Sequence, residues 1–181
     1  MGSARMSRFL PLQVAAVCYR RRGTAIEFLL VNTDRGDRWT FPKGATEPKL
    51  SHSQAAEREA LEEAGAVGVI EPRHFHLYLH PKASSGSRMR VEEFVVKAFL
   101  LEVTHTQSSH EPGRNPTWFS VDDARRALAK AREAKYAVEL HNVINRALEH
   151  LSAQETIAPD YRPARIHRAW RSLLRVLGFA R

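Results

Sequence analysis

Three glutamates, Glu59, Glu62 and Glu63, carry the clearest chemical signal in this sequence of 181 residues. They lie in a segment without Gly or Pro, residues 53–64, whose Ala, Glu and Leu content predicts a helix. The spacing i, i+3 and i+4 brings the three carboxylates to one side of that helix. Like charges so placed repel one another, and Mg²⁺, which prefers carboxylate oxygens, would neutralise them. The alternative is a solvated acidic face on a surface helix.

The residues on either side of the acids favour the metal site. Gly44 opens a loop before the helix, and Ser51 or Ser53 is the expected N-cap. Gly65 follows the acids directly, where a helix commonly ends in a left-handed residue. A loop glycine, a cap and a terminating glycine around clustered carboxylates are more than a surface helix requires.

Residues 44–66 resemble the signature of the NUDIX hydrolase family, G-x5-E-x7-R-E-U-x-E-E-x-G-U, in which U is a bulky or aliphatic residue. Gly44 matches the first glycine, and the run Arg58-Glu59-Ala60-Leu61-Glu62-Glu63-Ala64-Gly65-Ala66 matches the second half without a gap. The preceding run Trp39-Thr40-Phe41-Pro42-Lys43-Gly44 is also similar to this family, and the resemblance covers residues 12 to about 150. It implies an α/β fold, namely an α/β/α sandwich around a mixed sheet.

The resemblance also implies roles for individual residues. Glu59, Glu62 and Glu63 would be ligands of Mg²⁺ or Mn²⁺, and Arg58 would orient a glutamate through a charge-assisted hydrogen bond. Bound metal would neutralise charge that develops on a pyrophosphate while water attacks phosphorus. The family often adds one acid from outside the signature, for which Glu93 and Glu111 are the candidates. Glu92 is the neighbour of Glu93 on an expected strand, so only one of these two can face the site.

One position departs from the signature. The first glutamate falls on Leu50, within Pro48-Lys49-Leu50. This departure leaves open a second interpretation, a non-catalytic module of the same fold that binds a ligand. If the site is otherwise normal, Leu50→Glu is expected to preserve or raise activity.

The substrate class is suggested by the run before Gly44, which is most similar to the diadenosine polyphosphate hydrolase branch, close to enzymes that act on diphosphoinositol polyphosphates. Such substrates are polyanions, so basic residues near the signature are candidate phosphate contacts. The expected substrate-binding residues are Lys43, Gly44, Arg38, Lys82, Arg88 and Arg90. Two alternatives remain open: these charges only keep the surface solvated, or the enzyme is an RNA 5′-pyrophosphohydrolase.

Alternating and apolar stretches place the elements that would hold this site. Strands are expected at residues 12–19, 26–31, 39–41, 75–79, 91–103 and 118–120, with a turn at 22–24. Further helices are expected from Val121, capped by Ser120, and from about residue 135 to 151. Loops are expected at Lys43-Gly44 and over residues 81–90 and 104–116.

The charge is concentrated at the end of the chain. The formal net charge is +8, and residues 161–181 hold six Arg and no acid. Residues 8–155 are therefore expected to form the hydrolase domain and residues 156–181 a basic amphipathic C-terminal helix. Its apolar stripe has helical spacing and comprises Ile166, Trp170, Leu173, Leu174 and Leu177. It would pack on the domain or in a homodimer, or else contact nucleic acid or an anionic surface.

Composition excludes several other classes of protein. No apolar run approaches the roughly 18–20 residues of a membrane span, so an integral membrane protein with spanning helices is not expected. Cys18 is the only cysteine, which excludes an intramolecular disulfide and favours a reducing, cytoplasmic setting.

Overall fold

A computed structural model describes residues 10–33, 36, 38–83 and 91–157. Its contacts divide the chain into two units, residues 1–150 and 151–181. The first unit contains the sheet and all residues discussed below. The second is described only over residues 151–157, which form the end of a helix. The proposed basic tail at 158–181, including its apolar stripe, lies outside the described residues.

The described part of the chain contains eight strands and three helices. The strands are β1 (Leu12–Arg22), β2 (Ala25–Asn32), β3 (Trp39–Thr40), β4 (Lys43–Ala45), β5 (Ala66–Ile70), β6 (His76–Ala83), β7 (Val91–Thr106) and β8 (Thr117–Ser120). The helices are α1 (His52–Ala64), α2 (Val121–Ala129) and α3 (Ala134–Ile157).

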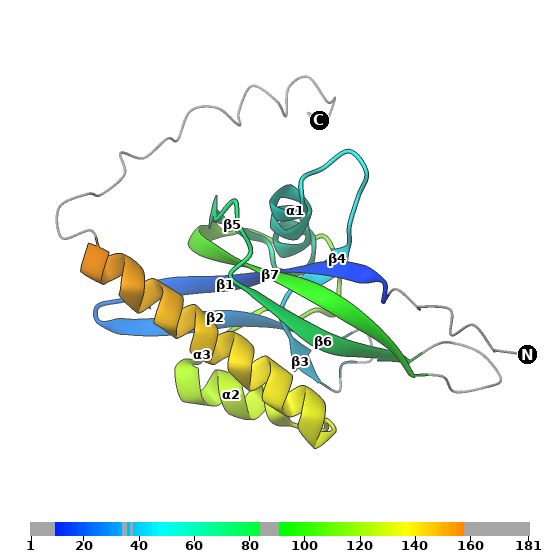
Figure 1. Ribbon diagram of the computed structural model, residues 1–181. Helices are drawn as coiled ribbons and strands as arrows, with labels where there is room; N and C mark the ends of the chain where they lie inside the picture. Colours follow the sequence, from blue (N-terminus) through cyan, green and yellow to red (C-terminus); the bar gives the residue numbers. More distant parts are fainter. Residues whose placement is uncertain (1–9, 34–35, 37, 84–90, 158–181) are drawn as a thin grey trace, which may run out of the picture. The chain divides into compact units, whose positions relative to one another are not determined.

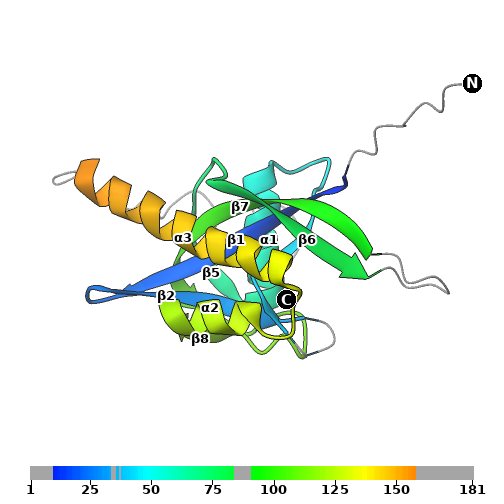
Figure 2. The same ribbon diagram turned by 60° about the horizontal axis from the view of Figure 1, so that its bottom comes forward.

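The strands form one mixed sheet with the order β3-β2-β1-β7-β5. β1 and β7 run parallel, from Leu12 opposite Val95 to Tyr19 opposite Glu102, whereas the other pairs are antiparallel. β4 pairs with β1, β6 with β7, and β8 with β2. α1 covers one face of the sheet, and α2 and α3 lie side by side on the other (Figures 1 and 2). The expected α/β/α sandwich with a mixed sheet is thereby confirmed.

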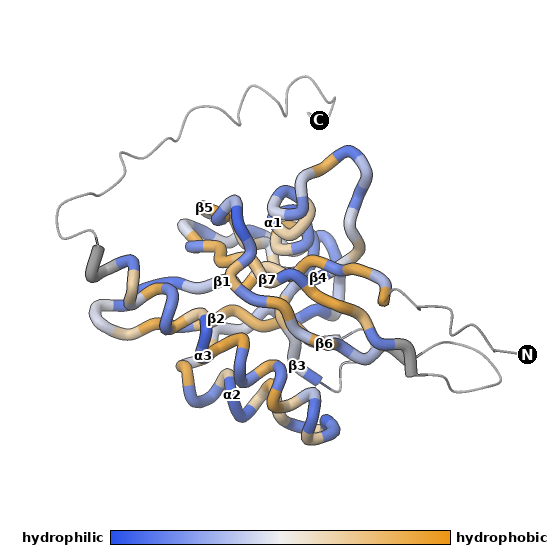
Figure 3. The backbone as a smooth tube through the Cα atoms, viewed as in Figure 1, coloured by the Kyte–Doolittle hydropathy of each residue, from blue (hydrophilic) through white to orange (hydrophobic). Residues whose placement is uncertain are grey.

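The core forms on both faces of the central strand β1, because residues 14–19 are almost fully buried. Val14, Ala16 and Cys18 share a hydrophobic cluster with four alanines of α1: Ala55, Ala56, Ala60 and Ala64. Small side chains allow the helix to lie close to the sheet. Figure 3 shows hydrophobic residues concentrated in the central strands and recurring along α3.

The structure corrects several expected boundaries. Lys43 and Gly44 belong to the short strand β4 rather than to a loop, because they pair with Ala15 and Val14 of β1. β6 continues past Leu79 to Ala83. Among the described strands it pairs only with β7, and an edge strand of this kind accommodates Pro81. β7 extends to Thr106, where it pairs with β5, a strand that the sequence did not predict.

Candidate functional site

Helix α1 is fixed at both ends by its own local sequence. The Ser51 side chain accepts a hydrogen bond from the Gln54 N–H, and the Gln54 side chain accepts one from the Ser51 N–H, which completes a capping box. At the other end Gly65 has a φ of 61°, and its N–H donates to the Leu61 carbonyl at 3.0 Å. Ser51 is therefore the N-cap, and the predicted stop at Gly65 is confirmed.

β4 brings the backbone directly against the acids of α1. A Cβ atom at Gly44 would overlap the carboxylate of Glu59, so only glycine allows this approach. One residue earlier, the Lys43 N–H donates to Oε2 of Glu63 at 3.1 Å. The β1–β4 pairing thus holds a strand within contact distance of two of the three glutamates.

Glu63 is the buried member of the group, with 4% of its surface exposed. Its Oε1 lies 2.7 Å from Nη2 of Arg114, a side chain that is itself largely buried. Burial raises the pKa of Glu63 to about 7, although the charges of Lys43 and Arg114 oppose this rise. A carboxyl group with this pKa can take up or release a proton near neutral pH.

Glu59 and Glu62 are less buried than Glu63. Burial raises the pKa of Glu59, and the neighbouring charge of Glu62 raises it further. Arg58 lies between acids from two segments. Its Nη1 donates to Oε2 of Glu47 at 2.7 Å, and its Nε lies 3.4 Å from Oε1 of Glu62.

The segment after β7 adds one more acid to this region. The backbone N–H groups of His110 and Glu111 donate to the Glu62 carbonyl at 3.0 and 3.1 Å. The Glu111 carboxylate then lies 2.6 Å from Nη2 of Arg114, so Arg114 bridges Glu63 and Glu111. The negative charge of Glu111 contributes to the raised pKa of Glu59.

Glu93, the other outside acid suggested by the sequence, is engaged elsewhere. Its Oε1 accepts hydrogen bonds from Lys135 Nζ at 3.0 Å and from the Tyr136 hydroxyl at 2.9 Å, both on α3. These contacts lower the pKa of Glu93. The structure therefore brings Glu111, and not Glu93, to the acids of α1.

Of the expected substrate-binding residues that the structure describes, only Lys43 and Gly44 are shown to lie against the acids of α1. Lys43 and Gly44 lie against Glu63 and Glu59. Arg38 is half-buried before β3, and its carbonyl accepts a hydrogen bond from the Thr33 N–H at 2.8 Å. The backbone of Lys82 pairs opposite Glu92, but its side chain lies outside the described set. Arg88 and Arg90 also lie outside the described residues.

Sequence reasoning missed two residues at this site. Glu47 contacts Arg58 although it lies three positions before the expected glutamate, and Arg114 contacts Glu63 from a segment expected to be loop. No local pattern marks either residue. Arg114 reaches Glu63 only because β7 and β8 return the chain to α1, a consequence of tertiary structure.

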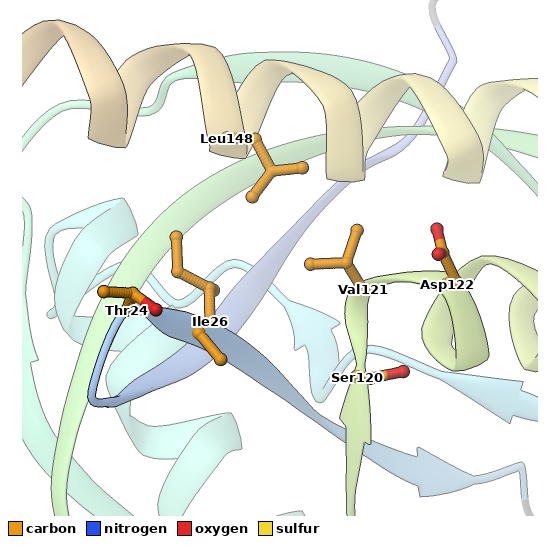
Figure 4. Close-up of a pocket in the computed structure, with 7 residues that line it drawn as sticks. Thr24, Ile26, Ser120, Val121, Asp122 and Leu148 are labelled. Atoms are coloured by element: carbon orange, nitrogen blue, oxygen red, sulfur yellow. The ribbon is translucent and has the colours of Figure 1, made fainter.

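A separate pocket of about 390 Å³ lies where the β1–β2 turn, the start of α2 and the side of α3 meet. Figure 4 shows its lining, which consists of Thr24, Ala25, Ile26, Ser120, Val121, Asp122 and Leu148. None of these residues was expected to carry chemistry. The pocket therefore does not compete with the acids of α1 as the candidate site.

The chemistry of the donors determines whether the residues fit a metal ion. Within the described residues, no three His, Cys, Asp or Glu side chains converge closely enough to form a metal centre. Glu63 and Glu111 instead face Arg114, and Glu62 faces Arg58. The groups available are all carboxylate oxygens, which are the ligands preferred by Mg²⁺ and Mn²⁺. Side-chain rotations within this cluster could exchange an arginine contact for a cation.

Comparison with known proteins identifies the class to which this mixed sheet and glutamate-bearing helix belong. The family profile described as the NUDIX domain matches residues 10–140. This chain therefore belongs to the NUDIX family, and it is a hydrolase of that family.

Two curated relatives illustrate the range of the family. The chain is 31% identical to diphosphoinositol polyphosphate phosphohydrolase 3-alpha of Mus musculus over 131 residues, which are 71% of this chain and 76% of the relative. It is 34% identical to Nudix hydrolase 18, mitochondrial, of Arabidopsis thaliana over 101 residues, which are 56% of this chain and 55% of that relative.

Solved structures share the fold. A C. elegans Ap4A hydrolase in a binary complex has a TM-score of 0.58 and 24% identity, covering 80% of this chain and 99% of that one. The NUDIX domain of Shewanella oneidensis NrtR, in complex with ADP ribose, has a TM-score of 0.56 and 18% identity, covering 83% of this chain and 94% of that one. At these identities the likeness concerns the fold alone. No helix among the described residues is long and apolar enough to span a membrane.

Proposed function

We propose that this chain is a Mg²⁺- or Mn²⁺-dependent pyrophosphohydrolase that cleaves a phosphoanhydride bond in a dinucleoside polyphosphate or a diphosphoinositol polyphosphate. The observation that carries the proposal is the group of acids on α1 beside β4: Glu59 lies against Gly44, and Glu63 is buried against Lys43 and Arg114. Burial raises the pKa of Glu63 to about 7, and carboxylates with strongly shifted pKa values are concentrated at functional sites.

Glu59, Glu62 and Glu63 are the proposed metal ligands, and Glu111 is the proposed acid from outside the signature. Bound Mg²⁺ would supply neutralisation of charge on the pyrophosphate oxygens. Glu111 is preferred to Glu93 because its backbone is hydrogen-bonded to Glu62 and its carboxylate raises the pKa of Glu59. Glu93 is held by Lys135 and Tyr136 instead.

Three residues of the chain are proposed for the remaining roles of proton acceptor, positioning residue and phosphate contact. Glu63 is also the proposed group that accepts a proton from the attacking water, at a carboxylate oxygen not used for the metal ion, whose charge would keep this carboxylate ionised. Arg58 keeps Glu62 oriented through the contact of its Nε with Oε1. Lys43 lies next to this group and is the proposed contact for a substrate phosphate, since its charge already acts on Glu59 and Glu63.

The substrate class is supported by the relatives whose names carry it. The mouse relative is a diphosphoinositol polyphosphate phosphohydrolase, and the C. elegans structure is an Ap4A hydrolase. Both names describe substrates with adjacent phosphates and high negative charge. RNA with a 5′-triphosphate has the same bond and is the rival substrate.

The experiment is a panel assay of product release with the full-length protein. Diadenosine tetraphosphate, a diphosphoinositol polyphosphate and 5′-triphosphorylated RNA are each incubated with Mg²⁺, with Mn²⁺ and with EDTA. The proposal predicts metal-dependent cleavage of one of the first two and little cleavage of RNA. Preferred cleavage of RNA supports the RNA pyrophosphohydrolase instead. Tight binding of a ligand without cleavage of any substrate supports a non-catalytic binding module.

A further inference from the structure

The position that departs from the family signature is occupied by a side chain that belongs to the core. Leu50 is partly buried and packs against the cluster formed by α1, β1, β2 and β7. A carboxylate in its place would lose contact with water on the side that packs against this apolar cluster, which costs free energy. The loop between β4 and α1 therefore does not use position 50 to contact Arg58.

Glu47, three residues earlier in the same loop, makes that contact. Arg58 Nη1 donates to Oε2 of Glu47 at 2.7 Å, and Nη2 makes an ion-pair contact with Oε1 at 2.6 Å, so both terminal nitrogens of Arg58 face the Glu47 carboxylate. The remaining nitrogen, Nε, lies 3.4 Å from Oε1 of Glu62. A planar guanidinium held at two nitrogens has its third N–H direction fixed as well.

We propose that Glu47 is a positioning residue of the metal site: its ion pair with Arg58 holds the Arg58 Nε towards Glu62. In this role Glu47 acts through Arg58 and is not itself a proposed metal ligand. The same ion pair joins the loop to α1, eleven residues apart in sequence. This inference rests on the proposed function, because it gives Glu62 the role of a ligand.

Replacing a residue of an ordinary surface ion pair would not change metal affinity in the way that replacing a positioning residue would. The side chains of Arg58, Glu47 and Glu62 are 44%, 30% and 34% exposed, and pairs with such exposure contribute little to folding. Residues that orient metal ligands, by contrast, typically change metal affinity by about 10- to 100-fold when they are replaced. Metal affinity and stability therefore separate a positioning role from a structural one.

The test is a double-mutant cycle on the full-length protein, read by direct Mn²⁺ binding without substrate. The variants are Glu47→Gln, Arg58→Met and the double variant, with Glu149→Gln as the matched control because Glu149 pairs with Arg146 at 2.8 Å on α3. Glu47→Gln is expected to weaken Mn²⁺ binding about tenfold with the same thermal stability as the control. The double variant is expected to bind no more weakly than Arg58→Met. Glu47→Asp is expected to recover part of the affinity.

Three results would overturn the proposal. The first is unchanged Mn²⁺ affinity in Glu47→Gln. The second is a further loss when Glu47→Gln is added to Arg58→Met, since this would mean that Glu47 acts by its charge alone. The third is an equal loss in the Glu149→Gln control. If the wild-type protein binds Mn²⁺ but cleaves no substrate in the panel, the proposed hydrolysis fails while the cycle still decides the role of Glu47. If it binds no Mn²⁺, both proposals fail.

Discussion

Nη2 of Arg114 lies 2.7 Å from Oε1 of Glu63, and the two side chains are 15% and 5% exposed. Removing one partner of such a pair leaves the other charge without compensation in the interior. Arg114→Met is therefore expected to lower the free energy of unfolding by roughly 2–4 kcal/mol at pH 8. The loss should be smaller at pH 6, because Glu63, whose pKa is about 7, can then be protonated.

Urea unfolding at the two pH values measures this difference. Arg146→Met is the control, because Arg146 forms an exposed pair with Glu149 whose removal should cost under about 1 kcal/mol at either pH. An equal loss for Arg114→Met at pH 6 and pH 8 would mean that the pair does not depend on the ionisation of Glu63.

The raised pKa of Glu63 also predicts how the free energy of unfolding of the metal-free protein depends on pH. Its pKa rises from 4.5 in the unfolded chain to about 7 in the folded one, so between these values the folded state binds the extra proton. Glu63 therefore contributes most to the free energy of unfolding below about pH 4.5. This contribution decreases as the pH rises to about 7 and then stays constant, and the whole decrease is about 3 kcal/mol. Unfolding of wild type and Glu63→Gln in EDTA across pH 5–8 isolates this contribution. Parallel curves for the two proteins would contradict it.

Gly44 leaves no space for a side chain beside Glu59. Because the atoms in the way are the end of the Glu59 side chain and not backbone, Gly44→Ala is expected to fold with Glu59 displaced. We expect hydrolysis to fall by at least about tenfold, since a displaced metal ligand loses electrostatic stabilisation of the transition state. The rate constant is compared with that of Ala45→Ser, a change at the exposed neighbouring residue. Normal activity in a folded Gly44→Ala protein would remove Glu59 from the proposed ligands.

The packing of Leu50 changes the expectation, based on the signature, that Leu50→Glu preserves or raises activity. Since its side chain packs on the core cluster and Glu47 already occupies Arg58, Leu50→Glu should lower the free energy of unfolding by about 1–3 kcal/mol and bring no gain in hydrolysis. Leu50→Gln has a similar shape without the charge and separates the cost of lost packing from that of the carboxylate. A clear rise in turnover for Leu50→Glu would show that a carboxylate at position 50 contributes to the site although Glu47 already pairs with Arg58.

Local sequence was sufficient to predict α1, but not the strand β4 that lies beside it, which was expected to be a loop. Ser51, Gln54 and Gly65 fix α1 through contacts within a few residues, so its ends could be predicted closely. The apolar runs at residues 12–19 and 91–103 likewise predicted the strands β1 and β7, although both strands extend three residues further than expected. β5 was missed because Gly68 interrupts a short stretch that becomes a strand only by pairing with β7.

The surroundings of the acids depended on long-range contacts. The signature fixed which glutamates share a side of α1, but not that Glu63 would be buried against Arg114. The choice between Glu93 and Glu111 also required the path of the chain, because it is α3 that holds Glu93 and the Glu62 carbonyl that holds the backbone of Glu111. Periodicity carries no information on such partners.

The central claim is that carboxylates of α1 hold a divalent cation that is needed for cleavage of a phosphoanhydride bond. The most direct measurement follows the cleavage of diadenosine tetraphosphate and of a diphosphoinositol polyphosphate by ³¹P NMR, for wild type and Glu62→Gln with Mg²⁺ and for wild type with EDTA. The account predicts cleavage of at least one substrate by wild type, a rate lower by roughly two to three orders of magnitude in folded Glu62→Gln, and none in EDTA. Undiminished cleavage in EDTA, or by Glu62→Gln, would contradict it.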